Sequence, residues 1–196
     1  RALGAYFAER HVPFEAVLRG TLRRHAQSMD AFAVGYTARS LTLPTPLDWP
    51  GLNEYDSEAL IKSVHPGPLA KPDSPEVYRA HFRLLREAMA AWMAGRTAPV
   101  GMPAYADWVR GITSALDHVR STHSGNVVVF SSGGPISTAV GHVLGTAAET
   151  TIELNLRIRN SSITEFAFTP KRHMLVTYNT VPHLDHPDRA DWVTYS

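Results

Sequence analysis

The sequence contains no cysteine among its 196 residues. This absence excludes disulfides, thiolate catalysis and cysteine-ligated zinc, and it fits a reducing compartment. No apolar run reaches the roughly 18 residues that a membrane-spanning helix needs. A large excess of positive or negative charge is also missing, because the sequence has 19 Lys and Arg residues and 18 Asp and Glu residues. Without a global basic field to attract nucleic acid or an anionic membrane, we expect a cytoplasmic protein with neither partner.

The composition is that of a globular protein. Hydrophobic residues make up 44% of the chain and charged residues 19%, which argues against a disordered or coiled-coil chain. We expect a single domain over residues 1–196, with an insertion or lid at about 41–100 that covers a pocket. The chain begins with Arg1 rather than Met, and helical spacing of Leu3 and Phe7 follows at once, so we also expect further sequence upstream.

Strand-like and helix-like segments alternate along the chain. Such alternation predicts an α/β fold, a three-layer αβα sandwich with a mostly parallel sheet. The segment Leu41–Pro50 contains three prolines and predicts a loop. Gly125 is expected to cap a helix, and the strand after it to be covered on both faces. The expected strands are Phe14–Leu18, Asn126–Phe130 and a hairpin of Ser162–Phe168 with Met174–Tyr178; the expected helices are Leu22–Tyr36, Ser57–Val64, Ser74–Gly95 and Ala104–Thr122.

The sharpest local feature is the turn Phe130-Ser-Ser-Gly-Gly-Pro-Ile136 between a strand and a helix. Free backbone N–H groups and the positive end of a helix dipole favour an anion there, and glycines let a phosphate approach closely. We therefore predict that Ser131, Ser132 and Gly133 bind phosphate. The alternative is structural: the serines cap the helix and the glycines only form a tight turn.

Two known motifs match this turn incompletely. It is not a Walker loop, because no Gly-Lys-Ser/Thr follows. Ser131 and Gly133 half-match a nucleophile elbow, but Val129 stands where the leading glycine belongs. A serine hydrolase therefore stays as a minor hypothesis.

Three further segments carry candidate groups. Arg24 follows the first strand at a helix start, where its planar fork suits a phosphate, whereas Arg23 is assigned to a solvated helix face. Glu54 lies in a loop, and a carboxyl group beside an anion site is a candidate general acid. His183 and His186 could form a metal pair, but an exposed loop is the favoured interpretation.

In order, these segments resemble the histidine phosphatase superfamily, the group that contains cofactor-dependent phosphoglycerate mutases. The segment Gly20-Thr-Leu-Arg-Arg-His-Ala-Gln-Ser28 has the form of the family's Gly/Ser-x-Leu-x-Arg-x-x-x-Thr motif, with Ser28 in place of Thr. The resemblance makes Arg24 the phosphate-binding arginine. Leu52-Asn-Glu54 matches Leu-x-Glu, which makes Glu54 the proton donor, and Ser131-Ser-Gly-Gly134 matches Ser-His-Gly-Gly.

Two departures from the family pattern concern its catalytic histidines. The resemblance places the nucleophilic histidine in an Arg-His-Gly segment, which we expect upstream of Leu3. Arg24-His25-Ala26 mimics that segment, but its position favours the arginine motif, so we reject His25 as the nucleophile. Ser132 replaces the second catalytic histidine and brings a hydroxyl without positive charge.

The resemblance thus implies an enzyme that hydrolyses or transfers the phosphoryl group of a small phosphomonoester through a phosphohistidine, without metal or other cofactor. Arg24 and Glu54 are the expected catalytic residues, and Arg24 with Ser131, Ser132 and Gly133 is expected to bind phosphate. The alternative is a non-catalytic module that binds a phosphorylated ligand or another partner. Substrate identity and the choice between mutase and phosphatase stay open, and the hairpin edge at Met174–Tyr178 offers pairing to a homodimer.

Overall fold

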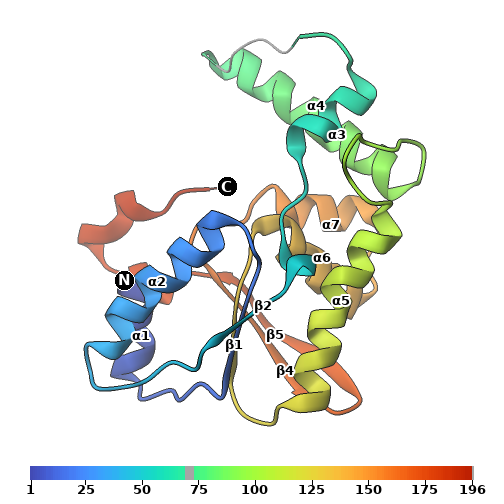
Figure 1. Cartoon of the computed structure of the whole chain (residues 1–196). Helices are drawn as coiled ribbons and strands as arrows, with labels where there is room; N and C mark the ends of the chain where they lie inside the picture. Colours follow the sequence, from blue (N-terminus) through green and yellow to red (C-terminus); the bar gives the residue numbers. More distant parts are fainter. Residues whose placement is uncertain (69–72, 196) are drawn as a thin grey trace.

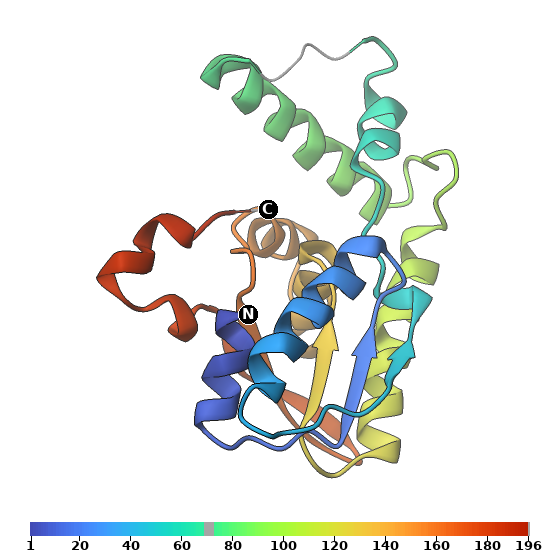
Figure 2. The same cartoon turned by 60° about the vertical axis from the view of Figure 1, so that its left-hand side comes forward.

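Three parallel strands form the sheet that carries the site. The computed structural model describes residues 1–68 and 73–195, so that part of the expected insertion at 69–72 lies outside the described residues. β1 (Ala16–Arg19) lies between β2 (Pro46–Asp48) and β3 (Val127–Phe130), and both pairings are parallel. Figure 2 shows the three arrows side by side, pointing toward the end of the molecule that carries α3 and α4.

The alternation of side chains along β1 builds two cores. Val17 packs on one face with Phe32 and Tyr36 of α2, while Leu18 packs on the other with Ala115 and other residues of α5. Helices therefore cover both faces of the sheet, as Figure 1 shows. This arrangement confirms the expected α/β sandwich with a parallel sheet.

The helices follow the predicted segments closely. Ser74 accepts a hydrogen bond from the backbone N–H of Val77 and Pro75 occupies the first turn, so α4 starts where the Ser-Pro-Glu sequence predicts. α3 and α4 stand beyond the C-terminal ends of the strands (Figure 1). The α-helices are α1 (Ala2–Glu9), α2 (Arg23–Thr37), α3 (Ser57–Val64), α4 (Pro75–Met93), α5 (Tyr105–Thr122), α6 (Gly133–Leu144) and α7 (Ala148–Asn155).

Two expectations about these elements were wrong, and a third holds only in part. The predicted loop Leu41–Pro50 contains β2, because an edge strand tolerates a proline at its first residue, here Pro46. Gly125 does not cap α5; its N–H donates to Glu15 Oε2 at 2.6 Å instead. The expected cover of β3 holds at Val127 and Val128, which pack into the two cores, but fails at Val129, which is 40% exposed. Helix α7 was not expected.

The C-terminal part adds the predicted hairpin. β4 (Ile163–Thr169) pairs antiparallel with β5 (Arg172–Thr180), which confirms that expectation. His183 follows in a short 3-10 helix and is buried, with Nε2 3.0 Å from Ser161 Oγ. The expectation of an exposed loop was therefore wrong for His183. No helix within the described ranges is long and apolar enough to cross a membrane.

Candidate functional site

The predicted chemical groups meet at one edge of the sheet. Arg24 follows β1, Glu54 follows β2 and a short 3-10 helix, and Ser132 directly precedes α6 after β3. Because the strands are parallel, their C-terminal ends share an edge, and the turns after them lie together. The sequence predicted these groups separately, and the topology brings them into one cluster.

Ser132 occupies the N-cap position of α6 but does not cap it. Its side chain makes no hydrogen bond to the helix backbone. Instead, Oγ accepts a hydrogen bond from Arg24 Nε at 3.1 Å and lies 2.6 Å from His25 Nε2. Glu54 accepts from the Gly134 N–H in the first turn, but the Ser132 side chain leaves other backbone N–H groups at the helix start unsatisfied, the arrangement that favours a bound anion. The N–H of Gly133, at the first helical position, is one such group.

Arg24 presents a cation to this helix start. Its side chain is exposed, and no acidic side chain forms an ion pair with it among the described residues. Only its Nε is engaged, by Ser132, which leaves the outer N–H groups of the guanidinium for an anion. Arg23 is also exposed, in agreement with its assignment to a solvated face.

His25 is part of the cluster, although sequence analysis considered it only as a nucleophile. The side chain is almost completely buried, at 2% exposure. Its ring lies against Gly20, where an added Cβ would be only 2.1 Å from Nδ1. Burial lowers the pKa of His25, and the neighbouring Arg24 charge lowers it further, while the Gly20 backbone acts in the opposite direction. The ring is therefore neutral near pH 7.

Glu54 lies where its carboxyl group contacts two backbone N–H groups. Its Oε2 accepts a hydrogen bond from the Gly134 N–H at 3.1 Å, and Oε1 accepts one from the Tyr55 N–H at 3.2 Å. Burial nevertheless raises the pKa of Glu54, outweighing these two hydrogen bonds and the nearby Arg24 charge. A Cβ at Gly134 would lie 2.0 Å from Oε1, so glycine is required there for the carboxyl group to fit.

Short hydrogen bonds join the three turns. Asn53 Oδ1 accepts from the Thr21 N–H at 2.7 Å, and Asn53 Nδ2 donates to Thr21 Oγ1 at 2.7 Å. Ser131 Oγ donates to the Leu52 carbonyl oxygen at 2.8 Å. These contacts fix the arginine turn and the turn before α6 to the segment that carries Glu54. The Ser131 hydroxyl is thus engaged in joining turns, and its role toward phosphate stays a prediction.

Tyr55 connects Glu54 to the helices beyond the sheet. Its hydroxyl accepts a hydrogen bond from Asn155 Nδ2 of α7 at 2.6 Å and lies 3.6 Å from Met89 Sδ of α4. The ring contacts Trp92 and Trp108 edge-on. Burial raises the pKa of Tyr55 well above its usual range, so the phenol stays protonated. The acid's neighbour is therefore held by α4, a helix of the expected insertion.

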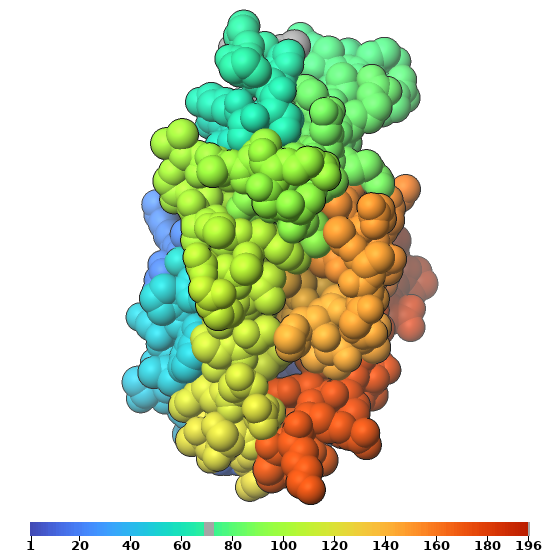
Figure 3. Space-filling model, turned by 90° about the vertical axis from the view of Figure 1, so that its right-hand side faces the viewer, coloured from blue at the N-terminus to red at the C-terminus, as the bar shows by residue number. Residues whose placement is uncertain are grey.

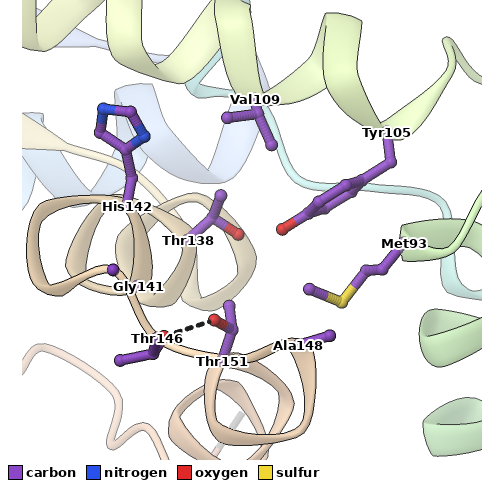
Figure 4. A pocket seen from close by; sticks show the side chains of 10 residues that line it. Met93, Tyr105, Val109, Thr138, Gly141, His142, Thr146, Ala148 and Thr151 are labelled. Carbon is purple, nitrogen blue, oxygen red and sulfur yellow. Dashed lines mark hydrogen bonds between the residues drawn. The ribbon is translucent and has the colours of Figure 1, made fainter.

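Two hollows of the structure are lined by other residues than those of this cluster. One, of about 330 Å³, lies between α5, α6 and α7 and is lined by Tyr105, Thr138 and His142 among others (Figure 4). Figure 3 views the face on which α5 lies beside α6 and α7. The other, of about 600 Å³, lies between α4 and α7. It contains four arginines, Arg79, Arg83, Arg86 and Arg157, of which Arg79 forms an ion pair with Glu76 and Arg86 one with Glu153.

Sequence reasoning missed two residues of the cluster, His25 and Asn53. His25 carried a visible signal, because Arg24-His25-Ala26 stood out, but that signal was tested against only one role. Asn53 carried none, since its function depends on a partner 32 positions away. Within the described ranges, no group of three or more His, Asp or Glu side chains is arranged to hold a metal ion.

Comparisons with known proteins agree with this geometry. The sequence matches the family description "Histidine phosphatase superfamily (branch 1)" over residues 1–181. No curated protein matches the chain. Among solved structures, a phosphoserine phosphatase mutant from Entamoeba histolytica in complex with phosphoserine has a TM-score of 0.57 and 16% identity, covering 93% of this chain and 81% of that one.

Two other solved structures share the fold. Phosphoglycerate mutase from Bacillus anthracis has a TM-score of 0.56 at 14% identity, covering 91% of this chain and 78% of that one. A mycobacterial glucosyl-3-phosphoglycerate phosphatase with inorganic phosphate has a TM-score of 0.57 at 20% identity, covering 94% and 86%. At such identities the likeness concerns the fold.

Proposed function

Because the chain belongs to the histidine phosphatase superfamily, branch 1, we propose that it hydrolyses or transfers the phosphoryl group of a small phosphomonoester. One observation carries the proposal: a guanidinium without an ion-pair partner among the described residues, a helix start that the Ser132 side chain does not cap and a carboxyl group with a raised pKa meet where three parallel strands end. An anion site beside a proton donor is the arrangement that phosphoryl transfer to or from an ester oxygen needs.

In this proposal the phosphate lies against Arg24, Ser132 and the N–H of Gly133. Arg24 holds two phosphate oxygens through its free N–H groups, and the helix start stabilises the negative charge. Glu54, whose pKa is raised by burial, gives its proton to the leaving oxygen. The resemblance assigns in-line attack to a histidine of an Arg-His-Gly segment; residues 1–196 do not contain that segment, so this step remains a prediction.

A second candidate function is binding without turnover. The observation that favours it is Ser132, a neutral hydroxyl where the resemblance places a catalytic histidine. Loss of one preorganised donor typically reduces a rate by about 10²–10³. A domain with such a loss retains its pocket and its affinity for a phosphorylated ligand.

The test compares Arg24→Ala with Arg23→Ala, two exposed arginines that are adjacent in sequence. Release of phosphate from p-nitrophenyl phosphate is measured together with binding of inorganic phosphate. We expect Arg24→Ala to reduce turnover by about 10²-fold or more, because the charge on the phosphate loses its partner, and Arg23→Ala to match the parent. Saturable phosphate binding without turnover would favour the binding module, whereas absence of both would refute either function.

The first natural substrates to test are anionic esters. The proteins of similar fold act on phosphoserine and on glucosyl-3-phosphoglycerate, which both carry a carboxylate. In this chain, the arginine-lined hollow adjoins α7, whose Asn155 donates a hydrogen bond to Tyr55, the neighbour of Glu54.

Labelling of Ser131 or Ser132 by a fluorophosphonate would instead support the serine hydrolase, and absence of labelling would exclude it.

A further inference from the structure

His25 forms the shortest side-chain contact of the cluster. Its Nε2 lies 2.6 Å from Ser132 Oγ, and the same oxygen accepts a hydrogen bond from Arg24 Nε. The imidazole cannot reach a ligand directly, since it is buried behind Ser132. Ser132 itself is only partly buried and stands at the start of α6 without capping it. The hydroxyl is thus interposed between an imidazole and the place where a phosphate would bind.

We propose that His25 is a proton-linked positioning residue that acts on the bound phosphate through the Ser132 hydroxyl. In the free protein, the hydroxyl donates its proton to the neutral Nε2. When a phosphate dianion binds, His25 takes up a proton from solvent, and its Nε2–H then donates to Oγ. The Ser132 O–H is released to rotate and donate to a phosphate oxygen. No covalent bond other than the new N–H is formed. This inference rests on the proposed phosphate site.

The charges around His25 agree with this exchange. The groups that face the ring are Arg24 from α2, the backbone of Gly20 from the turn after β1, and Ser132 from the turn before α6. Burial and the Arg24 charge favour the neutral ring, whereas the Gly20 backbone favours the protonated one. A phosphate dianion bound to Arg24 adds negative charge and opposes the effect of that arginine on His25. Phosphate binding and protonation of His25 therefore favour one another.

The position of His25 next to Ser132 also accounts for the serine at position 132. The resemblance expects an imidazole at position 132, and this chain places one a single hydrogen bond behind that position. If phosphate binding depends on the imidazole, a histidine at position 25 or at position 132 should support it. The swap variant, His25→Ser combined with Ser132→His, tests this idea directly.

The experiment measures binding of inorganic phosphate by titration calorimetry near pH 7. Repeating each titration in buffers of different ionisation enthalpy gives the number of protons taken up. The variants are His25→Gln, the swap variant, and His183→Gln as a matched control. His183 is also a buried histidine beside a serine hydroxyl, Ser161, but it lies outside the site.

For His25→Gln we expect phosphate binding to weaken about tenfold or more, as for loss of a hydrogen bond to a charged group. Proton uptake should fall by up to about one proton per site relative to the parent. The swap variant should regain part of both quantities, and His183→Gln should match the parent in both. Equal affinity and equal proton uptake in the parent and His25→Gln would overturn the inference.

A second measurement needs no variant. In the unsubstituted protein, the pKa of the His25 ring, followed by NMR, should rise when phosphate is added, and an unchanged pKa would overturn the inference. The two proposals fail differently. If phosphate binding depends on Arg24 while His25 shows no change, only the inference about His25 is wrong. If the unsubstituted protein binds no phosphate, the proposed function fails and this inference fails with it.

Discussion

Replacement of Glu54 by Gln separates proton donation from the other functions of the site. The carboxyl group accepts one backbone N–H on each oxygen, from Tyr55 and Gly134. Glutamine offers one carbonyl oxygen and one NH₂, so one of these partly buried N–H groups loses its acceptor, at a cost of about 1–3 kcal/mol. The substitution also removes a carboxyl group whose ionisation is disfavoured by burial, which offsets part of that cost at neutral pH. The variant should therefore fold.

The expected loss of activity depends on the leaving group. A positioned general acid contributes about 10²–10⁴ in rate when the leaving oxygen needs a proton. Glu54→Gln should therefore lose about that factor in kcat/KM for an alkyl phosphate. For p-nitrophenyl phosphate, whose leaving group departs without protonation, the loss should be much smaller. The assay is kcat/KM for the two esters with parent and variant. An equal loss for both esters would refute the assignment of Glu54 as the acid.

The pH dependence of the activity is an independent test of the role of Glu54 as the acid. The pKa of Glu54 is raised, so its proton persists to higher pH than on a free glutamate. Activity of the parent toward the alkyl ester should fall as the pH rises through that raised pKa, and Glu54→Gln should lack this decline. The stability that Glu54 contributes is likewise present at low pH and is lost as the pH rises, because the folded state holds the proton more tightly.

Three further substitutions test two residues that frame the site and one buried histidine outside it. Gly134→Ala should abolish turnover while the protein remains folded by circular dichroism, because a Cβ would lie 2.0 Å from Glu54 Oε1; an active variant would contradict the fit. Asn53→Ala breaks both hydrogen bonds to Thr21 and should lower the free energy of unfolding by about 1–3 kcal/mol in denaturant titrations, with weaker phosphate binding. Burial lowers the pKa of His183 from 6.5 to about 4. Protonation of His183 should therefore lower the free energy of unfolding by roughly 3 kcal/mol as the pH falls from above 6.5 to below 4. His183→Gln should reduce that loss in thermal melts.

The parts of the site that sequence could predict are those encoded locally. Arg24, Glu54 and Ser132 each follow a strand, in a turn whose residue types indicate an anion or a proton donor. Their meeting at one edge follows from parallel pairing, which alternating strands and helices predict. The long helix α4 likewise carries its own start signal at Ser74 and Pro75.

The parts that sequence could not predict depend on tertiary contacts. β2 has only three residues and begins with a proline, so its pairing with β1 decides its conformation rather than its propensity. The functional environment of His25 arises from Ser132, which is 107 positions away in the chain. The raised pKa of Glu54 arises from burial, which a loop sequence does not reveal.

The contacts of Tyr55 with Asn155 and Met89 link the environment of the Glu54 carboxyl group to helices α7 and α4. A movement of α4 would change the contact of Met89 with Tyr55, whose backbone N–H donates to Glu54 Oε1. By thermodynamic reciprocity, the charge on Glu54 then influences where α4 rests. Under the proposed function, a substrate that fits under α4 would thereby change the pKa of Glu54, and a substrate that does not fit would meet a less effective general acid. Selectivity under the proposed function would thus operate on the chemical step and not only on binding.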